Sequence, residues 1–139
     1  MSKGPEANFW NSIRANKPKD ALTTRIENRA GGGIPDLHVL WKGLPFWVEL
    51  KVQKSVITKV SPHQVAWHTA YWARGGLSFF LVKSLSSGYI HLIPGSEAVD
   101  LVQKPLSEVR GSMFKGHGEL WEALRAACFD HYSGVLRKL

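Results

Sequence analysis

Hydrophobic residues recur along the chain at two spacings, that of a helix face and that of a strand. Near the N-terminus, Phe9, Trp10 and Ile13 recur at helical spacing, which predicts a helix over residues 6–16. Pro5 suits the first position of that helix, because proline lacks the backbone N–H that the first turn leaves unpaired.

Alternation typical of strands follows this helix. Residues 19–30 are polar and basic and fit a short strand or an extended arm, and a run of three glycines then interrupts the pattern. Residues 36–41 and 45–52 are predicted strands joined by a hairpin turn at 42–44. Along the second strand the side chains alternate between two sides. One side is apolar, with Val48, Leu50 and Val52, and the other carries Trp47, Glu49 and Lys51.

The second half of the chain switches back to helical spacing. Ser61 begins a helix, with Pro62 at its first position and Gln64 as its capping-box partner. Gly75 and Gly76 end that helix. The remaining elements are expected as strands over 77–85 and 89–93, a short helix over 96–103, an irregular stretch over 105–118 and a closing helix over 119–139.

This order of elements predicts an α/β fold, an α/β/α sandwich with a central mixed β-sheet. We expect a single domain of 139 residues, with a core over about 5–94 and a C-terminal helical extension over about 95–139.

Composition excludes several classes of protein. The chain is 44% hydrophobic, enough for a real core, and no apolar run approaches the length of a membrane span. The N-terminal segment lacks the layout of a signal peptide. Cys128 is the single cysteine, so neither an intrachain disulfide nor a Cys-rich zinc site is possible. We therefore expect a cytoplasmic protein without a membrane partner.

The charge is strongly basic and uneven. The net charge is +7 and the sequence pI is about 9.8, which is typical of nucleic-acid-binding domains. Residues 14–59 hold nine basic and four acidic residues, whereas residues 60–139 hold eight and six. An anionic partner is therefore expected to contact the first half of the chain; the alternative is that the charge serves solubility alone.

Three charged residues are expected to meet at one place. Glu49 and Lys51 project from the same face of one strand, and the hairpin turn places Asp36 across from them. Two carboxylates, with a backbone carbonyl such as that of Leu50, offer the oxygen ligands that Mg²⁺ prefers. Lys51 can orient a water or stabilise charge on a phosphate. This set suits hydrolysis of a phosphodiester, although Asp36 also suits a turn and Glu49 and Lys51 also suit a solvated strand face.

These residues resemble a known signature. Gly31-Gly32-Gly33-Ile34-Pro35-Asp36, a gap of 12 residues and Glu49-Leu50-Lys51 resemble the motif of PD-(D/E)XK nucleases, most closely the VRR-NUC-like branch common in phages. Gln64, near the start of the following helix, and the glycines before strand 77–85 match the continuation of that motif. The resemblance covers residues 5–85, and the chain from 95 onward has no counterpart in it.

The resemblance implies a restriction-endonuclease-like fold, hydrolysis of DNA with Mg²⁺ or Mn²⁺, and often a homodimer. Several members of the branch resolve four-way Holliday junctions, and a phage-encoded member would work in the host-cell cytoplasm. Glu6 matches the acidic residue that such nucleases often carry on the first helix. In a structural reading, Glu6 only favours the helix dipole and Gln64 only caps its helix.

Further basic and aromatic residues surround this set. Phosphate contacts are expected at four basic positions, which are otherwise solvated charges: Arg25, Arg29, Lys54 and Lys59. A surface or packing role is favoured over metal binding for three histidines: His38, His63 and His68. A core or dimer contact is favoured over base stacking for three aromatics: Trp67, Tyr71 and Trp72.

The sequence thus predicts a divalent-metal-dependent endodeoxyribonuclease with a preference for branched DNA. Two alternatives stay open, a non-catalytic DNA-binding module on the same fold and a protein–protein interaction module with incidental charge. The strand 77–85, its hairpin to residue 93 and the closing helix are the expected dimer contacts.

Overall fold

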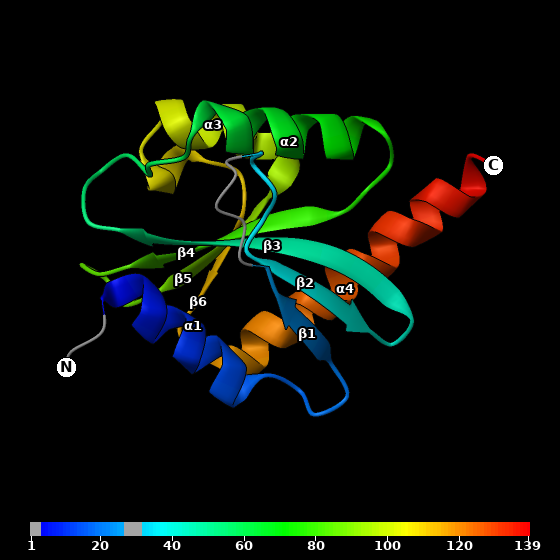
Figure 1. Cartoon of the computed structure of the whole chain (residues 1–139), viewed down its shortest axis with the longest axis horizontal. Coiled ribbons are helices and arrows are strands. Elements are labelled where there is room, and N and C mark those ends of the chain that lie inside the picture. The colour runs from blue at the N-terminus through cyan, green and yellow to red at the C-terminus, as the bar shows by residue number, and fades with distance from the viewer. Residues whose placement is uncertain (1–3, 27–31) are drawn as a thin grey trace.

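The chain forms a six-stranded sheet with helices on both faces (Figure 1). The structure is a computed structural model that describes residues 4–26 and 32–139. Strand order across the sheet follows chain order: β1 (Leu22–Arg25), β2 (Leu37–Trp41), β3 (Leu44–Gln53), β4 (Ser78–Ser84), β5 (Ile90–Pro94) and β6 (Ser112–Phe114). β3 and β4 pair in parallel and every other pair is antiparallel, so the sheet is mixed.

Helices cover the two faces of the sheet in pairs. α1 (Pro5–Asn16) and α4 (His117–Arg137) lie on one face, and α2 (Pro62–Ala73) and α3 (Ala98–Gln103) lie on the other (Figure 1). Each face has its own buried cluster, one that includes Phe9, Ile13 and Leu124, the other Phe80 and Leu101. The predicted α/β/α sandwich with a central mixed sheet is confirmed.

The β2–β3 hairpin fixes the register on which the site depends. Lys42 and Gly43 have φ angles of 53° and 79°, and two successive positive φ angles are typical of the tight turns that match strand twist. In the resulting register, Leu37 pairs with Val48. Asp36, one residue before β2, therefore lies beside Glu49.

The capping box predicted at the start of α2 is present. The Gln64 N–H donates to Ser61 Oγ at 3.1 Å, and the Ser61 N–H donates to Gln64 Oε1 at 3.0 Å. Pro62 occupies the first turn. Gly75, with a φ of 88°, follows the end of the helix as expected.

The C-terminal part of the chain corrects the sequence analysis. Residues 105–118, expected to be irregular, contain a short 3₁₀ helix (Leu106–Glu108) and edge strand β6, which pairs with β5. Three residues are too few to show an alternation. Residues 95–139 were expected to extend the core as helices. Their last helix, α4, is instead part of the main core, because Leu120, Trp121 and Leu124 are buried in it.

Among the described residues, no helix combines the length and apolar character needed to cross a bilayer.

Gly33 ties the glycine-rich segment to the start of α2. Its φ is 77°, and a Cβ added there would lie 2.2 Å from the backbone carbonyl oxygen of His63. Gly43 has a similar φ of 79° but nothing within 4 Å of the same added atom. Substituting each glycine by alanine therefore distinguishes the cost of backbone strain, which both positions share, from the cost of close contact, which only Gly33 has.

We expect Gly33→Ala to lower the free energy of unfolding by at least about 2 kcal/mol, because strain and a backbone clash add. Gly43→Ala, the matched control, pays strain alone and should lose about 1 kcal/mol. Urea denaturation measures both. Equal losses would contradict a tight contact between Gly33 and α2.

Candidate active site

Asp36 and Glu49 meet just before the start of β2, where the chain lies against β3. Asp36 Oδ2 accepts a hydrogen bond from the Leu50 backbone N–H at 2.9 Å, which fixes its side chain on β3. The Asp36 carbonyl accepts from the Ile26 N–H at 2.7 Å, which ties it to the end of β1. The predicted meeting of the two carboxyl groups therefore exists, and backbone contacts hold it.

Glu49 is buried without the partners that an ionised carboxylate needs. Its residue is 2% exposed, and its Oε1 has no hydrogen-bond partner among the described residues. Burial first, then the hydrogen bond and charge of Asp36, raise the pKa of Glu49 to about 10, and Lys51 opposes the rise only partly. Without a cation, Glu49 therefore keeps its proton at neutral pH.

This arrangement fits a divalent cation. A cation between the two carboxyl groups would satisfy the unpaired Oε1 and remove the reason for Glu49 to stay neutral. In the described part of the chain, no three His, Cys, Asp or Glu side chains gather in a metal-binding group. Mg²⁺ does not require such a group, because it binds through one or two carboxylates and keeps several waters.

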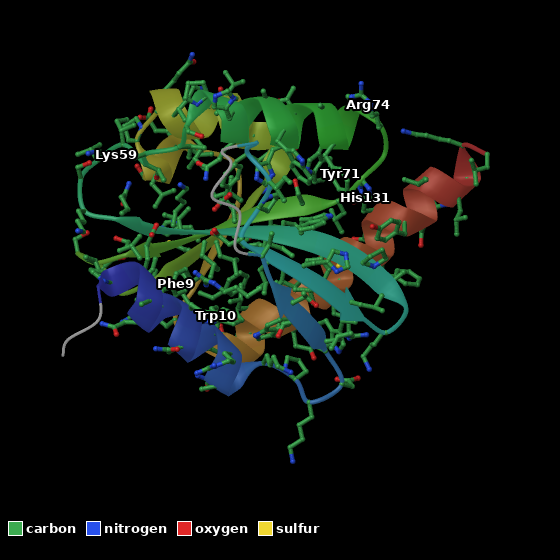
Figure 2. All side chains as sticks on the ribbon, viewed as in Figure 1. Phe9, Trp10, Lys59, Tyr71, Arg74 and His131 are labelled. Atoms are coloured by element: carbon green, nitrogen blue, oxygen red, sulfur yellow. The ribbon has the colours of Figure 1, made fainter. Side chains whose placement is uncertain are left out.

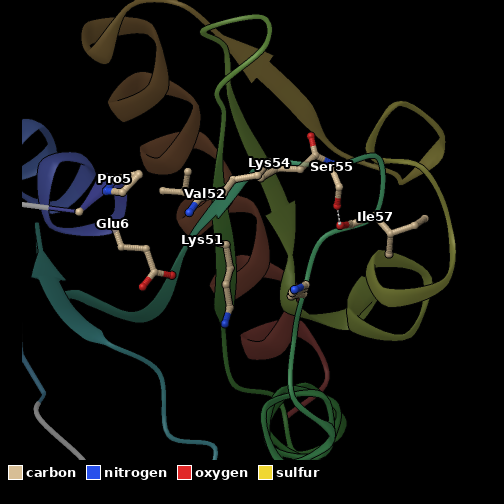
Figure 3. Close-up of a pocket in the computed structure, with 10 residues that line it drawn as sticks. Pro5, Glu6, Lys51, Val52, Lys54, Ser55 and Ile57 are labelled. Atoms are coloured by element: carbon tan, nitrogen blue, oxygen red, sulfur yellow. Dashed lines mark hydrogen bonds between the residues drawn. The ribbon is translucent and has the colours of Figure 1, made fainter.

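Lys51 and Glu6 face each other across a cavity of about 520 Å³ next to this pair (Figure 3). Lys51 reaches the cavity from β3, and Glu6 reaches it from the first turn of α1. The helix face that Glu6 shares with Trp10 and Ile13 would by itself predict a side chain that points inward, but Glu6 is exposed. Its position in the first turn, where α1 has not yet reached the core, leaves it exposed at the cavity rim.

Gln64 caps α2 and also lies beside Asp36. Its side chain completes the capping box of α2. The same residue lines a small cavity of about 150 Å³ together with Asp36, Gly33 and Ser61. The cap therefore places an amide group at the edge of the carboxylate site.

The predicted phosphate-binding residues lie at more than one place around the site. Lys54 and Lys59 are exposed and line the Lys51 cavity. Arg25 is exposed at the end of β1, next to Ile26, which lines the Asp36 cavity. Arg29 lies outside the described residues.

A buried polar network under the site was not predicted. His68 is fully buried, with Nδ1 2.7 Å from Ser78 Oγ, and Trp72 Nε1 donates to the same oxygen at 3.0 Å. Burial lowers the pKa of His68 to about 4, so its ring is neutral. The sequence offers only a weak signal for it, a histidine and a tryptophan four residues apart on an apolar helix.

His38 and the aromatic residues of α2 pack beside the site. His38 contacts Trp47 edge-on at 4.8 Å between ring centroids, and Trp67 stacks on Tyr71 at 4.6 Å. His63 is exposed at the start of α2.

No family model and no curated protein sequence matches the chain. Among solved structures, it is similar to a VRR_NUC domain, with 28% identity and a TM-score of 0.47 over 58% of this chain and 86% of that one. It is also similar to Hjc, a Holliday junction resolvase from the archaeal hyperthermophile Archaeoglobus fulgidus, with 14% identity and a TM-score of 0.49 over 66% and 75% of the two chains. These are the kinds of protein that the motif resembles.

Glu49 should make the stability of the metal-free protein fall as pH rises. The folded state keeps the Glu49 proton up to a pKa of about 10, whereas the unfolded chain releases it above about 4.5. The stability linked to this proton is therefore full below pH 4.5 and is lost progressively toward pH 10, by at most about 1.4 kcal/mol per pH unit.

We expect Glu49→Gln to flatten this dependence when urea denaturation is measured at pH 6 and pH 8 in a chelator. Glu122→Gln, an exposed glutamate on α4, is the control and should leave the slope unchanged. The same pH slope in Glu49→Gln and the parent protein would contradict the raised pKa.

Proposed function

We propose that this chain is a divalent-metal-dependent endodeoxyribonuclease that hydrolyses phosphodiester bonds of DNA. The observation that carries the proposal is the pairing of Asp36 with the buried, incompletely bonded Glu49 beside Lys51. Neighbouring lysines at the same cavity supply positive charge for a polyanion.

Asp36, Glu49 and the Leu50 carbonyl are the groups that we assign to the cation, Mg²⁺ or Mn²⁺. When bound, the cation supplies an acidified water and neutralises charge on the attacked phosphate. Glu49 must lose its proton to serve as a ligand, so loading of the site should be weaker at low pH.

The remaining residues act on substrate and water. Lys51 lies in the cavity with its ammonium group free to orient the attacking water or to stabilise charge on the phosphate. We assign Glu6 and Gln64 to the positioning of that water, because both reach the cavities that flank the carboxylates. Arg25, Arg29, Lys54 and Lys59 are assigned to the DNA backbone.

We further propose branched DNA, such as a Holliday junction, as the preferred substrate and a homodimer as the active assembly. Paired nicks across a junction need two opposed sites, which a two-fold dimer supplies. The cytoplasm remains the proposed location, since DNA is the substrate.

The structure corrects one of the expected dimer contacts. β4 lies between β3 and β5, and Phe79, Phe80 and Leu81 are at most 2% exposed, so this strand offers no free surface. A continuous apolar strand is typical of the centre of a sheet and says little about an interface. α4 stays a candidate, since Phe129 and Leu136 are 65% and 68% exposed.

Asp36→Asn, Glu49→Gln and Lys51→Ala should each lower the rate of DNA cleavage by about 100-fold or more, because each removes a group from one reacting centre. The double variant Asp36→Asn/Glu49→Gln should be little worse than either single one. Steady-state cleavage of a labelled four-way junction in Mg²⁺ measures these rates. Glu122→Gln and Lys104→Ala, exposed residues in surface ion pairs, are matched controls. Near-parental turnover in Glu49→Gln would overturn the assignment.

Asp36→Asn should leave DNA binding intact or strengthen it, because it removes a negative charge that repels phosphate when no cation is bound. Fluorescence anisotropy with Asp36→Asn in a chelator measures the affinity. A parent protein that binds DNA but cleaves none of the tested DNAs in any divalent cation would favour the non-catalytic alternative.

The assembly and the substrate preference are tested separately. We expect light scattering at micromolar concentration to give the mass of a dimer, and Phe129→Ser to shift it toward the monomer. A panel of four-way junction, flap, single-stranded and linear duplex DNA should show fastest cleavage of the junction. A strict monomer would contradict the dimer, and equal rates across the panel would contradict the preference for branches.

A further inference from the structure

Two arginines from different elements lie against the same indole ring. The guanidinium carbon of Arg25, on β1, is 5.1 Å from the ring centroid of Trp10. That of Arg14, one helical turn after Trp10 on α1, is 6.0 Å from the same ring. The Trp10 side chain extends from α1 on the side of the sheet (Figure 2) and is half-buried against the core.

Neither arginine is neutralised by this contact. Among the described residues, Arg25 makes no ion pair or side-chain hydrogen bond, and Arg14 only donates to the neutral Asn11 side chain at 3.3 Å. Both arginines are exposed. An aromatic ring contacts the face of a guanidinium and leaves the N–H groups at its edge available. The indole thus holds two positive charges in place without occupying their hydrogen-bond donors.

The position of this group connects it with the carboxylate site from two directions. Trp10 lies one helical turn after Glu6, which lines the Lys51 cavity. Arg25 directly precedes Ile26, whose N–H donates to the Asp36 carbonyl at 2.7 Å. The contact between Trp10 and Arg25 therefore joins the two elements that border the site.

The helix itself gives the spacing. At 1.5 Å per residue, Trp10 lies about 6 Å and Arg14 about 12 Å along α1 from Glu6. One strand of B-DNA advances about 3.4 Å per nucleotide. A strand that follows α1 away from the site would therefore bring phosphates about two to four nucleotides from the cleaved bond to these arginines.

We propose that Arg25 and Arg14, held by Trp10, form a phosphate clamp for the DNA strand being cut, about two to four nucleotides from the cleaved bond. This phosphate clamp rests on the proposed function, since it takes DNA as the ligand. It extends that function by naming Trp10 and Arg14 as binding residues and by fixing which phosphates they contact. The clamp reads no base, because its partners are backbone oxygens.

Single methylphosphonate substitutions in the DNA test the proposal. Each replaces one phosphate by a neutral group, and binding is measured with the inactive Asp36→Asn protein in a chelator. The position of the cut on the same junction is mapped with the parent protein. We expect a substitution two to four nucleotides from the cut to weaken binding about tenfold. In Asp36→Asn/Arg25→Gln, the same substitution should have little further effect, because its partner is already gone.

Variants of Trp10 test the role of its indole ring separately from the charge of the arginines. Trp10→Leu removes no charge, yet it should weaken binding about threefold to tenfold by releasing the arginines. Trp10→Phe, which keeps an aromatic face, should recover part of the loss. Arg14→Gln and Arg25→Gln should each reduce the salt slope by about 1. Arg110→Gln, an exposed arginine before β6, removes the same charge as a control and should leave the methylphosphonate profile unchanged.

The outcomes separate this phosphate clamp from the nuclease itself. The clamp alone would be overturned if the protein cleaves DNA but Arg25→Gln and Arg14→Gln change the binding affinity no more than Arg110→Gln does. Tight, Trp10-dependent binding without cleavage in any divalent cation would overturn the nuclease and, with it, the placement of the clamp relative to a cut, and would leave Trp10 and its arginines as contacts to the DNA backbone. No salt-dependent DNA binding by the parent would overturn both. If Trp10→Leu fails to fold, the Arg25→Gln methylphosphonate comparison still decides.

Discussion

Placing a second carboxyl group in a dry position beside the first is electrostatically unfavourable, and the rest of the site is arranged around this conflict. Glu49 is almost completely buried and lies beside Asp36, whose Oδ2 is held by the Leu50 backbone N–H. Proton retention by Glu49 relieves the repulsion in the absence of a cation. Lys51, Glu6 and Gln64 reach the adjoining cavities from three different elements, so charge and polar groups converge where burial is most costly.

The same conflict explains why the site needs rigid support. A carboxylate pair that was free to separate would relax away from a binding geometry. Here the tight hairpin turn fixes the register, and the close approach of Gly33 to the His63 carbonyl seats the glycine-rich segment against α2. On the far side of the sheet, Tyr132 of α4 donates to the Pro45 carbonyl at the beginning of β3. The hairpin turn and this hydrogen bond thus both fix the beginning of β3.

Much of this arrangement was predictable because its causes are local. Alternation along β3 places Glu49 and Lys51 on one face, and the hairpin turn places Asp36 across from them. The capping-box pair Ser61 and Gln64 predicts the start of α2. Features that depend on distant contacts were not predictable. β6 is too short to carry a pattern, the exposure of Glu6 depends on where α1 meets the sheet, and the burial of His68 depends on the separation of α2 from β4. The contact of Arg25 with Trp10 joins residues 15 positions apart through tertiary packing.

Strand order that follows chain order has a consequence for how the molecule is assembled. All five pairs of the described strands join neighbours in sequence, and the parallel pair, β3 with β4, is connected through α2. Hairpins close within microseconds, whereas parallel pairs wait for a longer loop to close. The β2–β3 hairpin holds Asp36, Glu49 and Lys51 on one short stretch of chain. We therefore expect a local folding event to bring these three residues together early, and the later docking of α2 to complete their burial.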